Sequence, residues 1–175
     1  MKKTVFLILL CVLILLAKPA VSETTGMDAP GYRVFWDRMR TTIERYLHRP
    51  YVWGATGLKS FDCSGFVWRV LNESGVLIKR MTARKLYVSL PNIERTEKYK
   101  PGNIVFFDDL KHCGIVSNER NFYHARTSMG TTLDDFNPYW NQKVFGFRAI
   151  PVPDDAGPVP VWFVGVGVGR DLSHY

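Results

Sequence analysis

The chain has 175 residues, of which 46% are apolar and 22% are charged, and its formal net charge at pH 7 is +7. This length and apolar content suffice for one domain with its own hydrophobic core. The basic balance favours contact with anionic polymers, although it is equally an ordinary aid to solubility. No basic run alternates with stacking aromatic residues as in a nucleic-acid-binding module, so we expect no nucleic-acid partner.

The first 22 residues have the pattern of a secretory signal peptide. Two lysines precede an uncharged apolar run over residues 5–17, and residues 20–22, Ala-Val-Ser, form a small-x-small cleavage site. The run is too short to span a bilayer of about 30 Å, and the leucine before the first cysteine is too large for a lipoprotein processing site. We therefore expect export without a transmembrane or lipid anchor, and a mature chain that starts near Glu23 with a net charge of +4.

An amphipathic helix is predicted next. It starts within residues 27–30 and ends at Arg49-Pro50, and its apolar positions recur at helical spacing: Tyr32, Phe35, Trp36, Met39, Ile43, Tyr46 and Leu47. We interpret this stripe as a face that packs on the core. A loop over residues 51–60 with two glycines follows.

A second helix carries the most informative residue, Cys63. The spacing of the apolar side chains predicts one buried face, with Asp62 as the N-cap and Gly75 as the stop. A thiol in the first turn feels the positive end of the helix dipole, so its pKa can fall from about 8.5 into a range of about 3.5 to 7.5. The carboxylate of Asp62 favours the protonated thiol, so a basic partner is required. Cys63 is therefore a candidate nucleophile.

The second half of the chain changes from helices to strands. Thr82 caps a short helix through Tyr87, and after Pro101-Gly102 strands are predicted at residues 103–107, 112–117, 122–126 and 143–150. Helices first and antiparallel strands second indicate an α+β fold. We expect one domain over residues 23–150. The Pro-, Gly- and Val-rich residues 151–175 are expected to form a tail on its surface, or to contact a membrane or partner through their apolar segment.

Two cysteines remain once the predicted signal is removed, Cys63 and Cys113, and a disulfide between them is the simplest reading in an oxidising compartment. Against it, His112 and Cys113 are neighbours on a predicted strand and point to opposite sides, so both should not reach Cys63. Two histidines and a thiol could also bind zinc, but the close CxxC or HxxxH spacing of common sites is absent. We expect neither a metal nor a cofactor.

A base for the thiol must come from four histidines, His48, His112, His124 and His174. His48 lies at a helix end and His174 beside the terminus, which leaves the two strand histidines. A lone strand histidine is more often structural. However, a three-residue loop over 118–120 would pair His124 with Gly114 and put His112 diagonally one step away, so that the two rings meet.

These segments resemble the NlpC/P60 family of papain-like cell-wall cysteine peptidases over roughly residues 31–150. Five motifs carry the resemblance, in this order: Tyr51-Val52-Trp53-Gly54-Ala55-Thr56-Gly57, Phe61-Asp62-Cys63-Ser64-Gly65, Lys100-Pro101-Gly102-Asn103, His112-Cys113-Gly114-Ile115-Val116 and Tyr123-His124-Ala125. The resemblance implies a papain-like α+β fold with N-terminal helices packed on a central antiparallel β-sheet. It also implies cleavage of peptidoglycan stem peptides, usually between D-glutamate and diaminopimelate, in the periplasm or outside the cell.

The resemblance assigns three catalytic roles. By family position Cys63 is the nucleophile, His112 is the general base, and His124 is the polar residue that orients His112. The alternatives from other functional classes are a domain that binds peptidoglycan or a partner without cleaving it, and a papain-like amidase or acyltransferase that acts on another envelope substrate.

Three further positions match family residues near the substrate. Tyr51 matches a tyrosine that lines the active site, and core packing is its alternative role. Asp62 and Ser64 match positions that bind substrate in some members, and helix capping is their alternative role. Ala55 replaces the second glycine of the Trp-Gly-Gly turn and Asn103 replaces the aspartate after Pro-Gly, which puts substrate preference in doubt more than activity.

Overall fold

The computed structural model describes residues 30–152. The predicted signal peptide and most of the predicted tail lie outside the described residues. The elements are, in order, α2 (Pro30–Arg45), α3 (Cys63–Glu73), α4 (Ala83–Ser89), the 3-10 turn η1 (Arg95–Glu97), β1 (Ile104–Phe107), β2 (His112–Val116), β3 (Asn121–Arg126), β4 (Gly130–Asp135), α5 (Pro138–Asn141) and β5 (Val144–Arg148). Within this part of the chain, none of the helices has the length and apolar character needed to cross a membrane.

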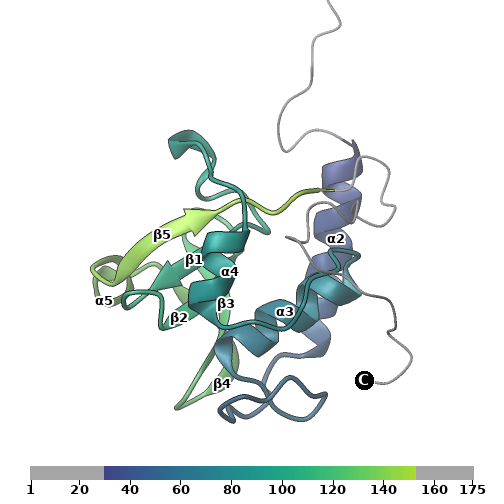
Figure 1. The fold of residues 1–175 in the computed structure, drawn as a ribbon, viewed down its shortest axis with the longest axis vertical. Helices are drawn as coiled ribbons and strands as arrows, with labels where there is room; N and C mark the ends of the chain where they lie inside the picture. Colours follow the sequence, from purple (N-terminus) through teal and green to yellow (C-terminus); the bar gives the residue numbers. More distant parts are fainter. Residues whose placement is uncertain (1–29, 153–175) are drawn as a thin grey trace, which may run out of the picture.

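Five antiparallel strands form a single sheet in the order β4-β3-β2-β1-β5 (Figure 1). Because side chains alternate along a strand, the central strands feed two apolar clusters. The helix-side cluster joins α2, α3 and α4 to strand residues Ile104, Phe106, Cys113, Ile115, Tyr123 and Ala125. The opposite cluster joins Trp140 of α5 to Val105, Phe107, Val116, Phe122 and Phe147. The predicted α+β fold with helices packed on an antiparallel sheet is confirmed.

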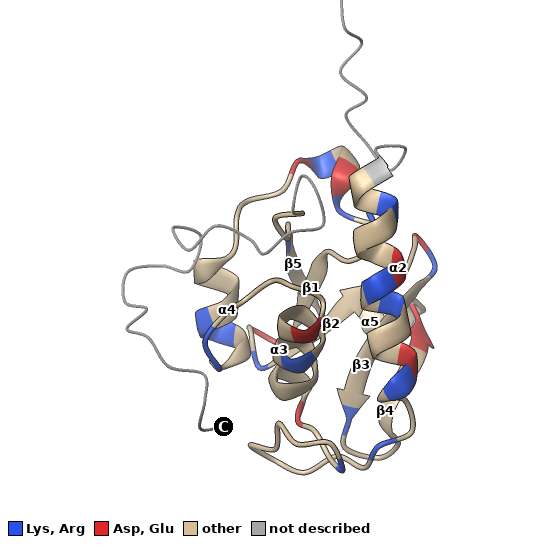
Figure 2. Ribbon diagram, turned by 90° about the vertical axis from the view of Figure 1, so that its right-hand side faces the viewer, with Lys and Arg blue, Asp and Glu red and all other residues tan. Residues whose placement is uncertain are grey.

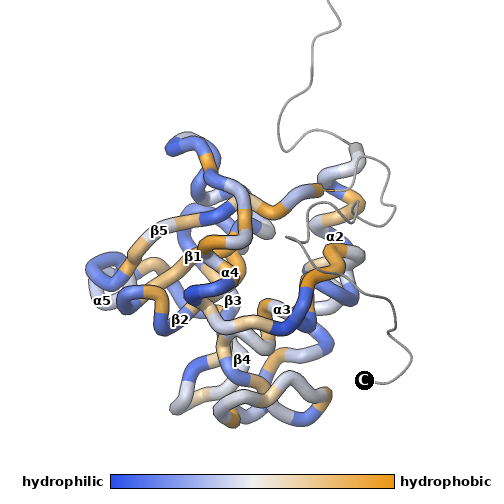
Figure 3. Tube along the Cα trace, viewed as in Figure 1, coloured by the Kyte–Doolittle hydropathy of each residue, from blue (hydrophilic) through white to orange (hydrophobic). Residues whose placement is uncertain are grey.

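The aromatic stripe of α2 is buried as the spacing predicts. Five of its members are at most 7% exposed and two are half-buried against the same cluster: Tyr32, Phe35, Met39, Ile43, Tyr46, and then Trp36 and Leu47. The outward face of α2 carries charges of both signs (Figure 2). Hydrophobic and hydrophilic stretches both occur along α2 and α3, as expected of helices with one buried face (Figure 3). The helix ends at Arg45, four residues before the predicted end.

The predicted capping residues of the next two helices are confirmed. The Asp62 side chain accepts from the Gly65 N–H at the start of α3, and the Thr82 side chain accepts from the Lys85 N–H at the start of α4. Gly75 follows α3 with a φ of 101°, in the left-handed region that stops helices.

Two elements were not predicted from the sequence, β4 and α5, and both lie between the predicted strands at residues 122–126 and 143–150. β4 carries a single large apolar residue, Leu133, which is 44% exposed, so it lacks the alternation that marks a strand. It forms because every one of its residues pairs with β3. α5 had a local signal, since the Asn137 side chain caps it and Pro138 occupies its first turn.

We predict that Gly65→Ala lowers the free energy of unfolding by about 2 kcal/mol. A methyl group there would lie 2.2 Å from the Ala55 carbonyl oxygen, and the higher helix propensity of alanine offsets only part of that clash. Gly57→Ala is the matched control, because its added methyl group meets no atom within 4 Å. Urea denaturation followed by circular dichroism measures both. Equal midpoints for the two variants would contradict the prediction.

Candidate active site

Cys63 is the first residue of α3, and its position is fixed by the N-cap. Asp62 Oδ1 accepts from the Gly65 N–H at 2.5 Å, which anchors the first turn. The Cys63 side chain is 6% exposed, and its Sγ lies 3.9 Å from the carbonyl oxygen of Lys111, the residue before β2. The start of α3 therefore faces the start of the strand that carries His112.

The Asp62 carboxylate joins three segments around the cysteine. Arg80 donates to both of its oxygens at 2.8 and 2.7 Å, and the Gly54 N–H donates to Oδ2 at 2.9 Å. The Ser64 hydroxyl donates to Oδ1 at 3.1 Å and accepts from Arg80 at 3.0 Å. Asp62 and Ser64 are thus committed to internal hydrogen bonds, and the substrate-binding role assigned to them stays a prediction.

The β2–β3 hairpin has the predicted register, with Gly114 opposite His124. The two histidines meet as expected, since His112 Nε2 lies 2.8 Å from His124 Nδ1. Gly114 makes this possible: a Cβ there would lie 2.7 Å from the Tyr123 carbonyl oxygen and 3.1 Å from the Cβ of His124. Its small size keeps the strands and the two rings at hydrogen-bonding distance.

Trp140 stacks on His112, with ring centroids 5.6 Å apart and planes inclined by 22°. His112 is half-buried, whereas His124 is completely buried. Burial, assisted by the charge of His112, holds the pKa of His124 well below its usual value, so that His124 is neutral at pH 7. Of the two histidines, His124 is therefore not the one that exchanges a proton with Cys63.

The surroundings of Cys63 lower the pKa of its thiol to about 5. The largest cause is a hydrogen bond from Cys113, followed among the lowering causes by the hydrogen bond and charge of His112; burial and the charge of Asp62 oppose them. Cys113 is fully buried, and the pKa of its thiol is raised well above the usual value. It therefore stays protonated and donates to the Cys63 thiolate. A thiolate at neutral pH is a strong nucleophile.

His112 and Cys113 point to opposite faces of the sheet, since His112 stacks on Trp140 and Cys113 lies in the helix-side cluster, yet both lower the pKa of the Cys63 thiol. The two cysteines are nevertheless free thiols in the structure rather than a disulfide.

Tyr51 lies near the cysteine and is half-buried against the helix-side cluster, which is compatible with both roles considered for it. Burial and the neighbouring charges of Cys63 and Asp62 raise the pKa of Tyr51 to about 12, so it remains a hydroxyl donor. His48 ends the α2 segment with a φ of 61° and donates its N–H to the Thr131 carbonyl, apart from the site. His174 lies outside the described residues.

Sequence reasoning missed three residues that complete the site: Arg80, Asp134 and Trp140. Asp134 Oδ2 lies 3.2 Å from His124 Nε2, and it also accepts from the Trp140 indole at 3.1 Å. Asp134 belongs to the unpredicted strand β4, and Trp140 to the unpredicted helix α5. Within residues 30–152, no three His, Cys, Asp or Glu side chains are grouped so that they could hold a metal ion.

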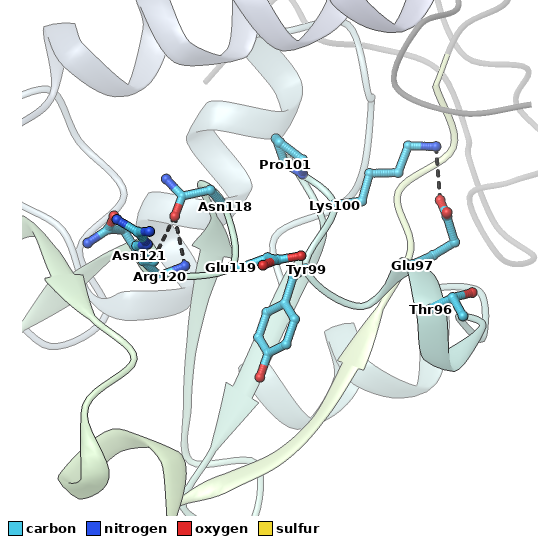
Figure 4. Close-up of a pocket in the computed structure, with 9 residues that line it drawn as sticks. All are labelled: Thr96, Glu97, Tyr99, Lys100, Pro101, Asn118, Glu119, Arg120 and Asn121. Carbon is cyan, nitrogen blue, oxygen red and sulfur yellow. Dashed lines mark hydrogen bonds and ion pairs between the residues drawn. The ribbon is translucent and has the colours of Figure 1, made fainter.

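A cavity of about 610 Å³ lies at the far end of the β2–β3 hairpin and contains none of the three candidate catalytic residues (Figure 4). Its wall includes Lys100 paired with Glu97 at 3.1 Å, and Asn118, whose Oδ1 accepts from the N–H groups of Arg120 and Asn121. These polar groups satisfy one another, so we assign the chemistry to the cysteine site and not to this cavity.

The fold and the site together define a papain-like α+β architecture, in which the N-terminus of a helix presents a cysteine to a histidine on the sheet. A model described as the NlpC/P60 family matches residues 48–149, more than half of the chain, and the chain belongs to this family.

Three curated relatives are similar over the same region. The probable endopeptidase p60 of Listeria seeligeri is 32% identical over 111 residues, which cover 61% of this chain and 21% of the relative. The probable peptidoglycan endopeptidase LytE of Bacillus subtilis is 33% identical over 104 residues, covering 57% and 30%. The gamma-DL-glutamyl hydrolase of B. subtilis is 30% identical over 113 residues, covering 60% and 27%. The match thus spans less than a third of each relative.

A solved structure agrees with the fold. It is a protein of the NLP/P60 family described as similar to lipoprotein, from Staphylococcus aureus, with a TM-score of 0.58 and 27% identity over 65% of this chain and 40% of that chain.

We predict that iodoacetamide alkylates Cys63 with a half-maximal rate near pH 5, because the thiolate is lost only as the pH falls through its lowered pKa. Cys113→Ala removes the donor and moves this midpoint to higher pH, whereas Cys113→Ser keeps a donor and moves it less. Mass spectrometry of the Cys63 peptide measures the rate between pH 4 and 9. A midpoint unchanged in Cys113→Ala would show that Cys113 does not stabilise the thiolate.

Proposed function

We propose that the protein is an exported cysteine endopeptidase that hydrolyses stem peptides of peptidoglycan, at the bond between γ-D-glutamate and diaminopimelate. The observation that carries this proposal is the position of Cys63 at the start of α3, with its Sγ 3.9 Å from the carbonyl oxygen of Lys111, next to His112, whose Nε2 lies 2.8 Å from His124 Nδ1. His112 and Cys113 also lower the pKa of this thiol to about 5. The names of the relatives support the substrate, since one is a peptidoglycan endopeptidase and another a gamma-DL-glutamyl hydrolase.

The proposed reaction proceeds through a thioester. The Cys63 thiolate attacks the amide carbonyl, and the backbone N–H of Cys63 donates to the oxyanion, an interaction whose loss typically costs about 100- to 1,000-fold in rate. The imidazolium of His112 protonates the leaving amine as the C–N bond breaks. Neutral His112 then takes a proton from water as the water oxygen attacks the thioester carbonyl. The C–S bond breaks, the carboxylic acid product leaves, and the Cys63 thiolate and the His112 imidazolium are restored. His124 holds the other ring nitrogen of His112 throughout.

Export and domain organisation are part of the proposal. We assign residues 1–22 to a signal peptide, residues 23–150 to the catalytic domain and residues 151–175 to a tail, so that the enzyme acts in the periplasm or outside the cell. Tyr51, which lies beside the nucleophile and keeps its hydroxyl proton, is the proposed contact to the substrate peptide. The mechanism requires no metal ion and no cofactor.

We predict that the chain without residues 1–22 cuts purified muropeptides between D-glutamate and diaminopimelate, and that Cys63→Ala does not. Mass spectrometry of monomeric and cross-linked muropeptides identifies the fragments. Gly57→Ala is the matched control, because its added methyl group meets no atom within 4 Å, and circular dichroism of Cys63→Ala checks that this variant folds.

The other outcomes separate the alternatives. Fragments from Cys63→Ala would exclude the thioester. No fragments from either protein, together with binding to intact sacculi, would favour a domain that binds peptidoglycan without cleaving it. No fragments and no binding would direct the search to another acyl substrate for an amidase or acyltransferase.

A further inference from the structure

The buried side of His124 faces a carboxylate. Its Nε2 atom is completely enclosed and has no well-aligned acceptor, and Asp134 Oδ2 lies 3.2 Å away. An enclosed N–H without an acceptor is destabilising, and a small rotation of either side chain toward the other would give this N–H an acceptor. The carboxylate is therefore the acceptor for this N–H.

Strand pairing brings the two side chains together. His124 pairs with Thr132 on β4, and Asp134 is two residues further along, so it lies on the same face of the sheet. Such diagonal neighbours are within reach of long or ring-shaped side chains. Asp135, the next residue, lies on the other face and is exposed, and it contacts Asn121.

The Asp134 carboxylate is held by two further donors. Trp140 Nε1 and Arg126 Nη1 both donate to Oδ2, at 3.1 and 2.9 Å, and the Asp134 side chain is only 14% exposed. Trp140 also stacks on His112, so this side chain contacts both His112 and the carboxylate behind His124. The orientation of the carboxylate toward His124 is thus fixed by groups outside the pair.

We propose that Asp134 is a positioning residue. It determines which ring nitrogen of His124 and of His112 carries the proton in the hydrogen-bonded chain that leads to Cys63. A carboxylate only accepts, so it requires the proton of neutral His124 on Nε2. His124 Nδ1 is then an acceptor, and the hydrogen at this 2.8 Å contact belongs to His112 Nε2. The remaining nitrogen of neutral His112, Nδ1, carries a lone pair and receives the thiol proton. This inference rests on the proposed function only for its effect on turnover.

The charged groups around the series Asp134, His124, His112 and Cys63 determine how strongly Asp134 stabilises the thiolate–imidazolium pair. His112 faces the Cys63 thiolate from α3 and neutral His124 from β3, and Asp134 lies behind His124. Arg126, a third exposed, opposes Asp134 because it contacts the same oxygen. On the cysteine side, Asp62 is neutralised by Arg80, and Tyr51 and Cys113 are protonated. Asp134 therefore supplies the negative charge behind the imidazolium.

The test is Asp134→Asn, with Asp135→Asn as the matched control on the opposite face. The change removes the charge but keeps the size, so the thiolate–imidazolium pair loses stability. The pH midpoint of Cys63 alkylation should rise by about one unit, and the basic limb of kcat/KM for muropeptide cleavage should move to lower pH. We expect kcat/KM near neutral pH to fall about 10- to 100-fold, less than the roughly 10⁴-fold known for a carboxylate that touches the base directly. Asp135→Asn should change neither limb.

A second variant tests the sign. Arg126→Gln removes the opposing charge while Trp140 still holds the carboxylate, so the alkylation midpoint should fall; this arm remains informative if Asp134→Asn does not fold. Lower activity of Asp134→Asn with an unmoved alkylation midpoint would reduce Asp134 to a structural residue and overturn the proposal. Alkylation needs no substrate: a shifted midpoint in a protein that cuts no muropeptide would refute only the proposed function.

Discussion

The carboxylate of Asp62 is the point on which the geometry of the site depends. It caps α3 and accepts from the Gly54 N–H in the loop over residues 51–60. Both of its oxygens also accept from Arg80 Nη2, just before α4. A buried carboxylate destabilises the fold unless it is paired and hydrogen-bonded. Separation of these segments would leave the Asp62 charge without its partners, so they stay together. Cys63 is held at the helix start as a consequence, at the point where β2 begins.

The second constraint is the register of the β2–β3 hairpin, because a slip of one residue would send His124 to the opposite face of the sheet. Three features hold the register: the loop over residues 118–120, the apolar faces on both sides of the sheet, and Gly114, which leaves no space for a side chain between the strands. The same register carries the His124 ring toward β4. The contact between the two histidines and the contact of His124 with Asp134 therefore both depend on the register of β2 and β3.

The parts of the site that could be predicted are those with local signals. Helical spacing and an N-cap located Cys63, and the parity of a short loop located the histidine pair. The contacts of Arg80, Asp134 and Trp140 are formed by residues distant in sequence, and β4 exists through pairing with β3 rather than through its own apolar pattern. Alternation placed His112 and Cys113 on opposite faces, but the sequence could not show that both act on Cys63, because that depends on how α3 packs against the start of β2.

The two carboxylates of the site are paired unequally, and the inequality favours charge separation. Asp62, beside the anion, meets Arg80 through both oxygens, and its side chain is 9% exposed. Asp134, behind His124, meets Arg126 through one oxygen only, while the two arginines are similarly exposed, at 29% for Arg80 and 34% for Arg126. The charge of Asp62, which disfavours the thiolate, is thus better neutralised than the charge of Asp134, which favours the imidazolium. This asymmetry favours a negative charge on Cys63, in agreement with the lowered pKa of its thiol.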